Sequence, residues 1–467
     1  MRAPARAAKT IVLGDIGSTF IKLAGVSADG ELLARASVAT THQDLGAGVA
    51  AAQALLAAKL GAALPIEEVI LSSSAGGGLR VVVLGFERDL TIKAAMRASA
   101  TAGARIVGVY TDAELSAESA DRFHARAADL ALLTGGTDGG DEQSIIHNAE
   151  ALARLAPELP VVVAGNRAAT ERVRRLLGNG RPVEFVDNVM PRVGELDSGS
   201  AQTAIRRIFI ERVIGRGRFA SASTLAGAVR MPTPAAVLAG AQIVAALGAR
   251  RAQLSAPVVV DVGGATTDVH SVIAESEPVP GYATTGLADA VLTRTVEGDL
   301  GLRENAEALV EAAVREGCVD AGEEDGLRRA AQRRRTQRDY VASDEQELLT
   351  DERLGRLAST IALLRHAGVL QTSLTPAGAV LRRTGRDLRA ASCLIVTGGV
   401  FEHSACAGAV ASAALREVHA RGGLISPDLE VLTDSSYLLW AAGLLAASHP
   451  LAAERVAEAT LVEATHR

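Results

Sequence analysis

The sequence has few cysteines and few aromatic residues, and it lacks a long uninterrupted apolar run. Only three of its 467 residues are cysteine, and none forms a Cys-x-x-Cys pair, which argues against a zinc ribbon or a locally encoded cluster site. The longest uncharged stretches, 231–249 and 435–453, are broken by polar residues or proline, so neither predicts a membrane-spanning helix. The apolar run Ile11–Leu13 is too short for a signal-peptide core. We therefore expect a reduced, cytoplasmic environment and no membrane partner.

The sequence also lacks an excess of positive charge. Its 48 lysine and arginine residues face 54 aspartate and glutamate residues, which gives a net charge of −6. General electrostatic attraction to nucleic acid is absent, so we expect no nucleic-acid partner. Hydrophobic residues make up 48% of the chain and charged residues 22%. This composition excludes wholesale disorder and is typical of a globular chain that buries a large core.

The pattern of strands, helices and glycine turns predicts an α/β protein. Residues 10–40 have the pattern of a strand meander, followed by a helix over 44–60 and a strand at 67–71. Between 80 and 187, five strand-like runs alternate with helical stretches, which predicts a separate Rossmann-like insert with a parallel sheet. Residues 284–366 are expected to be mainly helical. We place four segments along the chain: 1–79, the inserted α/β domain at 80–187, 188–255 with a connecting helix, and 256–467 with a helical insert at about 284–390.

A charged stretch at 320–352 carries arginines beside many acids. A solvated helical surface is the simpler interpretation, and a partner-docking face is the alternative. The arginines are Arg328, Arg329, Arg333, Arg334, Arg335 and Arg338.

The first segment that points to chemistry reads DIGSTFIK and begins at Asp15, between two predicted strands. Gly17 would allow a positive φ and a close backbone approach. Successive amides there can form an anion-binding concavity, to which the hydroxyls of Ser18 and Thr19 add donors, and Lys22 can face phosphates as a point charge. Two like charges ~4 Å apart at an effective dielectric of ~20 repel by about 4 kcal/mol, so a phosphate beside Asp15 calls for a bridging Mg²⁺. An ordinary hairpin turn is the alternative.

The second segment, DVGGATTD, runs from Asp261 to Asp268 after a buried valine run. It repeats the order of the first segment: strand, aspartate, glycine and hydroxyl residues. Two such turns predict two duplicated halves, each presenting a hairpin to a shared cleft, whereas a purely structural turn is the alternative. The residues between the two aspartates that we expect near phosphates are Gly263, Gly264, Ala265, Thr266 and Thr267.

The third segment, Ile395–Phe401, is a predicted strand that enters the double glycine Gly398-Gly399. Two glycines allow a flat ligand or a phosphate to lie directly against the backbone. Taken alone, the segment fits a structural turn equally well.

In this order, the three segments resemble the phosphate-1, phosphate-2 and adenosine motifs of the superfamily of actin, heat-shock chaperone and sugar-kinase ATPases. Residues 231–240 are similar to its first connecting helix, with Met231 where the chaperones have glutamate, and residues 436–443 are similar to the second. The resemblance implies duplicated actin-like (ribonuclease H-like) ATPase halves around a nucleotide cleft. It also implies ATP or ADP and Mg²⁺ as cofactors.

The resemblance further implies roles for individual residues. Asp15, Asp261 and Asp268 would position Mg²⁺ and the attacking water, with Asp15 and Asp261 holding the metal through water. Phosphoryl transfer needs mainly such positioning and charge neutralisation. The nucleotide would be held by Gly17, Ser18, Thr19, Lys22, Gly263, Gly264, Ala265, Thr266 and Thr267 at the phosphates and by Gly398 and Gly399 at the adenosine.

Within this superfamily, the whole chain most resembles the MutL/GlmL family, which is unrelated to mismatch-repair MutL. These are accessory proteins of adenosylcobalamin-dependent mutases such as glutamate mutase. The supporting segments are 14–22, 133–140 and 187–191. The resemblance implies a slow ATPase that reactivates a mutase by nucleotide-driven release of damaged cobalamin. Its partners would be mutase subunits, and self-association stays open.

Three other functions remain open at this point. A small-molecule kinase on the same fold would phosphorylate a substrate. An activator of the 2-hydroxyacyl-CoA dehydratase type would carry an iron–sulfur cluster, although Cys393 and Cys406 flank the glycine turn, a poor place for cluster ligands. A non-catalytic nucleotide-binding scaffold would explain Met231.

Two further segments have competing interpretations. The loop 133–140 follows a predicted parallel strand and precedes a helix, so it is either an anion site or a turn that Asp141 caps. The sequence from Asp268 to Ile273 nearly spells the cobalamin motif D-x-H-x-x-G. We expect His270 to lie in a strand of the second hairpin instead.

Overall fold

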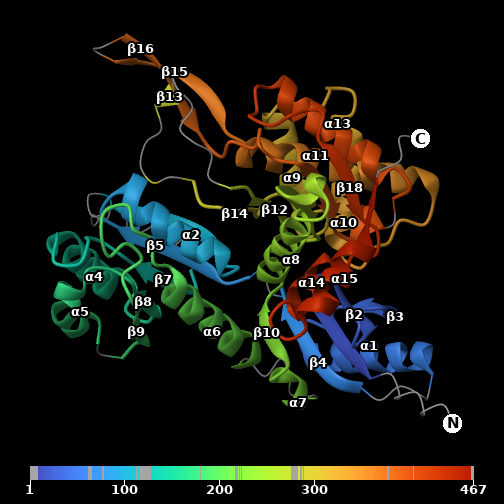
Figure 1. Cartoon of the computed structure of the whole chain (residues 1–467), viewed down its shortest axis with the longest axis horizontal. Coiled ribbons are helices and arrows are strands. Elements are labelled where there is room, and N and C mark those ends of the chain that lie inside the picture. The colour runs from blue at the N-terminus through green and yellow to red at the C-terminus, as the bar shows by residue number, and fades with distance from the viewer. Residues whose placement is uncertain are drawn as a thin grey trace. The chain divides into compact units, whose positions relative to one another are not determined.

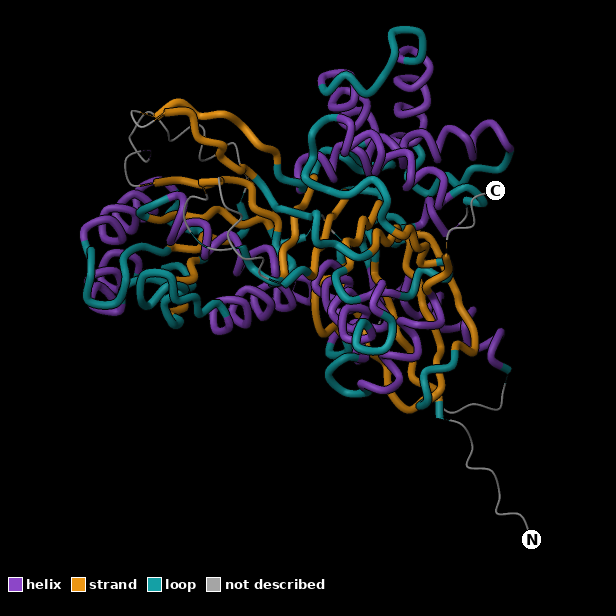
Figure 2. Tube along the Cα trace, turned by 45° about the horizontal axis from the view of Figure 1, so that its top comes forward, coloured by secondary structure: helices purple, strands orange, loops and turns teal. Residues whose placement is uncertain are grey.

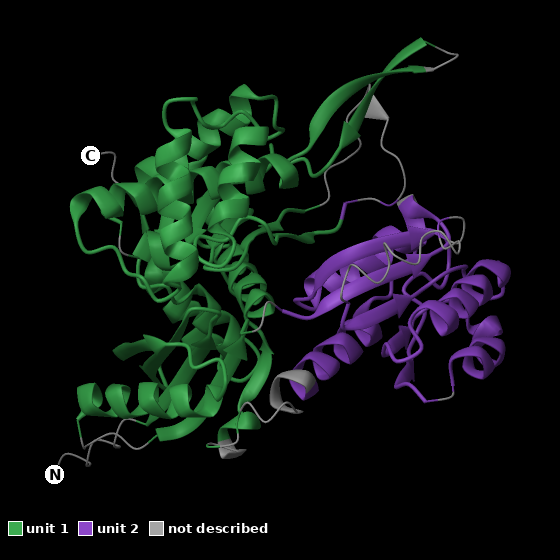
Figure 3. Ribbon diagram, turned by 180° about the vertical axis from the view of Figure 1, so that it is seen from behind, with its two compact units in different colours: residues 1–77, 213–283, 290–467 green, residues 78–212, 284–289 purple. Residues whose placement is uncertain are grey.

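The computed structural model divides the chain into two compact units. Unit 1 comprises Met1–Gly77, Val213–Ala283 and Ala290–Arg467, and unit 2 comprises Gly78–Arg212 and Thr284–Asp289 (Figure 3). The residues that the structure describes are 9–61, 66–75, 78–111, 114, 128–178, 180–215, 219, 221, 223–274, 282–283, 287, 289–375, 378–402 and 404–463.

The first half of unit 1 is built on a mixed five-stranded sheet in the order β10-β4-β1-β2-β3. The strands β1, β2 and β3 form an antiparallel meander, whereas β4 and β10 run parallel to β1. The expected meander, helix and strand at the start of the chain are therefore confirmed. The elements are β1 (Thr10–Ile16), β2 (Phe20–Ser27), β3 (Leu32–Ala39), α1 (Leu45–Leu60), β4 (Ile66–Ser73), α7 (Ser223–Ala226), β10 (Val229–Pro232) and α8 (Thr233–Leu247).

The second half repeats this topology in the sheet β14-β12-β11-β17-β18-β19. Here β11, β12 and β14 form the antiparallel meander, and β17 and β18 run parallel to β11. The same pairing order in two sheets confirms the predicted duplication of actin-like halves. The strands are β11 (Pro257–Val262), β12 (Thr267–Val272), β14 (Leu292–Glu297), β17 (Cys393–Thr397), β18 (Glu430–Asp434) and β19 (Leu461–Glu463).

The two sheets of unit 1 share one hydrophobic core, which α8, α14 (Leu439–Leu445) and α15 (Pro450–Thr460) fill (Figure 1). Helices α8 and α14 approach each other through glycine. A Cβ on Gly240 would lie 2.2 Å from the carbonyl oxygen of Leu439, and one on Gly443 would lie 1.8 Å from that of Ala236. Any larger residue would force the helices apart, because side chains cannot approach backbone so closely. These two helices are the connecting helices expected from the sequence.

A second core covers the other face of the second sheet. Alternate residues of β11, Val258 and Val260, face this core, whereas Val259 faces the core shared by the two sheets. The covering helices are α9 (Ala306–Arg315), α10 (Glu324–Thr336), α11 (Glu345–His366) and α13 (Ala407–Ala420), and a short helix, α12 (Gly399–Glu402), follows β17. The backbone path of these elements can be followed in Figure 2.

The region expected to be mainly helical also contains strands. Residues Leu292–Glu297 form β14, an edge strand of the second sheet, and their three β-branched residues favour a strand. The strands β15 (Val369–Thr375) and β16 (Gly378–Thr384) form a hairpin that projects from the second half (Figure 1), and β13 (Tyr282–Ala283) pairs with β16. The β-branched residues of β14 were the signal that the expectation of helix overlooked.

Unit 2 contains a five-stranded sheet in the order β6-β5-β7-β8-β9, in which every pairing is parallel. The predicted parallel sheet with five strands is thus confirmed. The elements are β5 (Arg80–Gly85), α2 (Lys93–Thr101), β6 (Arg105–Thr111), β7 (Leu130–Leu133), α4 (Gln143–Leu155), β8 (Val161–Val163), α5 (Thr170–Leu177) and β9 (Val183–Phe185), and α6 (Gly199–Gly215) leads back to unit 1.

Within the described part of the chain, no helix has the length and apolarity needed to cross a membrane.

His366, at the end of α11, makes stability depend on pH. Its ring nitrogens lie 3.0 Å from the hydroxyls of Ser271 and Thr295, and burial lowers its pKa to about 3, with Arg386 adding to the effect. The folded state therefore keeps this ring neutral while the unfolded chain protonates it below about pH 6.5. The contribution of the neutral ring to the free energy of unfolding is therefore full above pH 6.5, and it decreases as the pH falls below that value.

We compare the unfolding free energy of wild type with that of His366→Asn. We expect the difference in favour of wild type to be about 2 kcal/mol smaller at pH 5 than at pH 8. Urea denaturation of the full chain at both pH values measures this difference, with the exposed His42→Asn as control. An advantage that is equal at the two pH values contradicts the prediction.

Candidate functional site

The two glycine turns predicted to form the cleft meet in unit 1. A Cβ built on Gly264 would lie 2.6 Å from the Cγ2 atom of Thr19, 3.0 Å from its Oγ1 atom and 3.5 Å from the Oγ atom of Ser18. The turn after β11 therefore lies directly against the turn after β1, although the two are far apart in the sequence. A side chain at position 264 would therefore displace the side chain of Thr19.

The first hairpin places a carboxylate and an ammonium group side by side. Asp15 on β1 and Lys22 on β2 are cross-strand partners in the antiparallel register. Gly17 does not adopt the left-handed conformation that glycine would allow there. Glycine is needed there for the close approach alone, since a Cβ would lie 2.7 Å from the carbonyl oxygen of Phe20.

The Asp15 carboxylate is buried and hydrogen-bonded at both oxygens. The hydroxyl of Thr233, at the start of α8, donates to Oδ1 at 2.7 Å, and the hydroxyl of Tyr437 donates to Oδ2 at 3.4 Å. Burial raises the pKa of Asp15, while the Thr233 hydrogen bond and the Lys22 ammonium act in the opposite direction. The connecting helix thus reaches the site through its first residue.

The second hairpin pairs two acids across the strands. Asp261 on β11 lies opposite Asp268 on β12. Asp268 is neutralised by Arg294 on β14, whose Nε and Nη2 atoms lie 2.9 Å and 2.7 Å from Oδ1, and the hydroxyl of Thr266 donates to Oδ2 at 3.1 Å. Asp268 is therefore a satisfied ion pair in the present structure.

Asp261 is the unsatisfied carboxylate of the site. Its Oδ1 atom is buried and has no hydrogen-bond partner within the described residues. Burial, followed by the nearby carboxylates of Asp268 and Asp15, raises the pKa of Asp261 to about 8. A buried acceptor without a partner indicates a missing water or ion.

This orphaned oxygen is compatible with Mg²⁺, which prefers carboxylate, water and phosphate ligands. Among the described residues, no group of three or more His, Cys, Asp or Glu side chains is arranged to hold a metal. An ion at Asp261 would therefore need further ligands from water and from a phosphate.

Backbone amides of both turns are available to an anion. In the part of the chain that the structure describes, no group accepts a hydrogen bond from the amides of Ser18, Thr19, Gly264 or Ala265. The Gly263 amide is already used, because it donates to the Thr266 carbonyl at 2.9 Å.

Thr267 and Ala265 differ from the other phosphate-site residues. Thr267 is fully buried and its hydroxyl donates to the Leu300 carbonyl at 2.7 Å, which leaves that hydroxyl unavailable to a ligand. Ala265 is also buried, and its carbonyl accepts from the Asn305 side chain at 2.7 Å. Thr267 therefore stabilises the turn, whereas Ala265 can offer a ligand its backbone amide.

The third glycine turn lies beside the other two. Gly398 has a φ of 113°, and a Cβ there would lie 2.2 Å from the carbonyl oxygen of Val262, at the end of β11. A Cβ on Gly399 would lie 3.5 Å from the Nζ atom of Lys22. All three predicted segments are thus brought together.

Two side chains near Lys22 were not predicted. The Nζ atom of Lys22 lies 3.5 Å from the centroid of the Tyr437 ring and 3.9 Å from Oε2 of Glu402. Glu402 also pairs with Arg35 at 2.7 Å. Burial lowers the pKa of Lys22, against the effect of Glu402 and the neighbouring aspartates.

The missed residues differ in the signal that they left in the sequence. Thr233 and Tyr437 lie within the segments similar to the connecting helices, so their positions were marked even though their roles were not. Glu402 follows the double glycine closely. Arg294 left no local signal, because its partner is set by the pairing of β14 with β12.

The other sequence candidates have structural roles. Asp141 accepts from the Ser144 amide at 3.1 Å and so caps α4, as the turn interpretation of loop 133–140 predicted. His270 lies in β12 and is fully buried, which agrees with the strand interpretation.

The cysteines offer little support for a shared iron–sulfur cluster. Cys318 and Cys393 are buried, and only Cys406 is exposed. An iron–sulfur cluster is usually bound by four thiolates. A cluster shared between two copies of this chain would find only one exposed cysteine on each copy.

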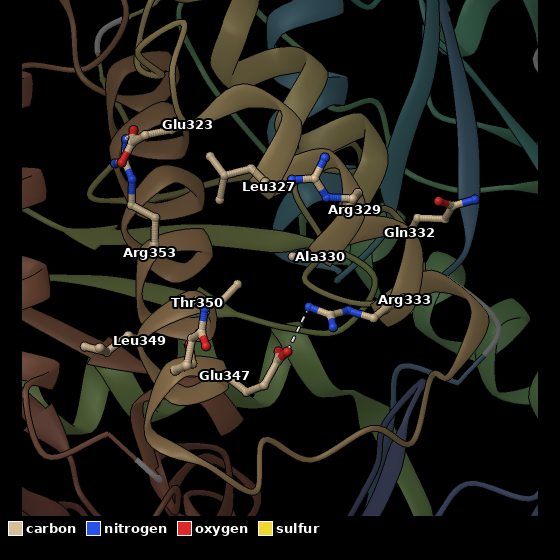
Figure 4. Close-up of a pocket in the computed structure, with 12 residues that line it drawn as sticks. Glu323, Leu327, Arg329, Ala330, Gln332, Arg333, Glu347, Leu349, Thr350 and Arg353 are labelled. Carbon is tan, nitrogen blue, oxygen red and sulfur yellow. Dashed lines mark hydrogen bonds and ion pairs between the residues drawn. The ribbon is translucent and has the colours of Figure 1, made fainter.

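A cavity of about 700 Å³ lies between α10 and α11, apart from the three turns (Figure 4). The arginines beside it are mostly paired: Arg333 with Glu347 at 2.8 Å and Arg353 with Glu323 at 2.7 Å. The expected solvated surface is only partly correct, because Arg334 is fully buried and bonds to both Asp351 and Glu347. This ion cluster ties α10 to α11.

Comparison with known proteins places the chain in a family. The family model described as MutL protein matches residues 11–461. The chain belongs to the MutL family. Protein MutL of Clostridium tetanomorphum is 35% identical over 465 residues, which cover 97% of this chain and 99% of the relative.

Solved structures show weaker similarity. The nucleotide-free structure of acetone carboxylase has 14% identity and a TM-score of 0.41, covering 95% of this chain and 71% of the other. Component A of (R)-2-hydroxyglutaryl-CoA dehydratase from Acidaminococcus fermentans has 10% identity and a TM-score of 0.30, covering 97% and 100%. Because these scores are low, the duplicated fold rests on the sheet topology described above.

The raised pKa of Asp261 predicts a pH-dependent stability. The folded state holds a proton that the unfolded chain releases between its ordinary value of 3.8 and about 8, so wild-type stability falls as the pH rises through this window. We expect Asp261→Asn to match wild type at or below pH 4 and to exceed it by a few kcal/mol at pH 9, at about 1.4 kcal/mol per pKa unit.

Urea denaturation in buffer containing EDTA measures this difference, and the exposed Asp428→Asn serves as the matched control. Equal stability of wild type and Asp261→Asn at pH 9 would contradict the assignment of Asp261 as the uncompensated acid.

Proposed function

We propose that this protein binds Mg·ATP between its two hairpin turns and hydrolyses it slowly. The observation that carries the proposal is the contact of Gly264 with Thr19, which closes two amide-rich turns on one another beside an unpartnered Asp261. Successive free amides are suited to phosphate oxygens. Membership of the MutL family, with its actin-like fold, supports a nucleotide-binding accessory protein.

In this proposal the phosphates lie between the amides of Ser18 and Thr19 on one side and Gly264 and Ala265 on the other. The ammonium of Lys22 adds positive charge, which stabilises the charge on the transferred group. A magnesium ion would neutralise phosphate charge, held through water by Asp15 and Asp261.

The remaining chemistry is assigned to side chains around the phosphates. Asp261, with its free oxygen, accepts a hydrogen bond from the attacking water and orients it. Asp268, paired with Arg294, lies opposite Asp261 on the neighbouring strand. Gly398 and Gly399 offer bare backbone to the adenosine.

Removal of the free carboxylate should reduce turnover. We expect Asp261→Asn to lower the rate of ATP hydrolysis about 100-fold or more, the usual contribution of a positioned proton acceptor. Phosphate release measures the rate, and Asp428→Asn controls for the loss of one negative charge. Unchanged turnover in Asp261→Asn would reject the hydrolytic role.

We further propose that the nucleotide cycle reactivates an adenosylcobalamin-dependent mutase of the glutamate mutase type. The support is the family assignment together with the resemblance to the MutL/GlmL accessory proteins. Because the two turns belong to different halves of unit 1, hydrolysis would alter how those halves hold together, and such motions commonly accompany turnover. Release of damaged cobalamin from the mutase would be coupled to that change.

This coupling predicts nucleotide-dependent release. Glutamate mutase loaded with hydroxocobalamin is incubated with the protein and Mg·ATP, Mg·ADP or no nucleotide, and the cobalamin that leaves the mutase is measured by absorbance after gel filtration. We expect release with Mg·ATP and wild type, and little release with Asp261→Asn. Release that is equal with and without nucleotide would sink the proposal.

A further inference from the structure

Tyr437 has an unusual backbone conformation next to the candidate site. It lies between β18 and α14 and has a φ of 50°. Among the residues that the structure describes, no other non-glycine residue has a positive φ. This conformation costs free energy for a bulky side chain, and it persists only where surrounding contacts enforce it.

Several contacts enforce it. Arg35 donates to the carbonyl of Ser436 at 2.6 Å, and a buried carboxylate and a tryptophan supply further hydrogen bonds. Asp434, at the end of β18, accepts from the amides of Leu438 and Leu439 at 2.8 Å and 3.0 Å. Its side chain also accepts from the hydroxyls of Thr397 and Thr460. The indole of Trp440 donates to the carbonyl of Tyr437 at 2.8 Å. The turn is therefore fixed on both sides of Tyr437.

The strained turn directs the Tyr437 side chain at both charged groups of the first hairpin. Its ring lies 3.5 Å from the Nζ atom of Lys22, within the range of a cation–π contact. Its hydroxyl donates to Oδ2 of Asp15 at 3.4 Å. Glu402 competes with the ring for the Lys22 ammonium. Its Oε2 atom lies 3.9 Å from Nζ, which is a long distance for an ion pair.

We propose that Tyr437 is a positioning residue, whose ring holds the Lys22 ammonium toward the phosphate turns. This inference rests on the proposed nucleotide site. Without the ring, Lys22 moves onto Glu402 and its charge is lost to the ligand. Tyr437 thus acts through Lys22, without contact to the reacting atoms.

The first arm of the test needs no nucleotide. A double-mutant cycle combines Tyr437→Leu with Lys22→Met, and urea denaturation of the full chain reports stability. We expect Lys22→Met to shift the unfolding midpoint less in the Tyr437→Leu background than in wild type, because the shared contact is already gone. Additive shifts would overturn the role of Tyr437, whatever the protein binds.

The second arm measures Mg·ATP binding by calorimetry. We expect Tyr437→Phe, which keeps the ring, to bind within about threefold of wild type, and Tyr437→Leu to bind about tenfold more weakly, as the loss of one modest charge contact would give. The double variant Tyr437→Leu/Glu402→Gln should recover most of that loss, because Lys22 then lacks the competing carboxylate. A merely structural role for Tyr437 would show no such recovery.

The two proposals fail in different ways. Wild type that binds no Mg·ATP overturns the proposed function, even where the stability cycle shows coupling. Wild type that binds Mg·ATP, with Tyr437→Leu binding equally well or unrescued by Glu402→Gln, overturns the positioning role alone.

Discussion

The close approach of two glycine turns is the constraint on which the rest of unit 1 depends. Thr19 and Gly264 lie so near each other that a side chain at position 264 would displace Thr19, and this contact brings buried aspartates from two separate sheets together. The helices between the sheets serve the same geometry. Gly240 on α8 and Gly443 on α14 allow backbone to touch backbone, so the halves are held at a separation that lets the turns meet.

Burial of several acids together is unfavourable unless each finds a partner. Most of them do. Asp268 has Arg294, Asp15 has the hydroxyls of Thr233 and Tyr437, and Asp434 is saturated by amides and hydroxyls. Asp261 is left with a free buried oxygen. This uneven distribution of partners distinguishes a site from a structural ion cluster such as Arg334 with Asp351, in which every charge is matched.

The local parts of this arrangement were predictable from the sequence, whereas several of the contacts were not. Each hairpin follows from a strand, an aspartate and a glycine turn, and the parallel sheet of unit 2 follows from alternating strand and helix patterns. The strand β14 was overlooked in a region expected to be mainly helical, and with it Arg294. Glu402 and Tyr437 gained their roles only from their distance to Lys22. Sequence patterns report periodicity and turn chemistry, but a contact between distant segments depends on how the sheets pack.

The sequence by itself therefore determined which segments fold into strand–turn–strand units and which residue types those turns carry, because these are set by neighbours a few positions away. It also carried the family assignment. The tertiary structure decided which acids are neutralised and which remains open, since a pKa depends on burial and on charges supplied by other elements. It likewise decided that Gly17 serves close packing instead of a left-handed turn, and that the strained Tyr437 meets Lys22, because both depend on backbone positions that no local pattern encodes.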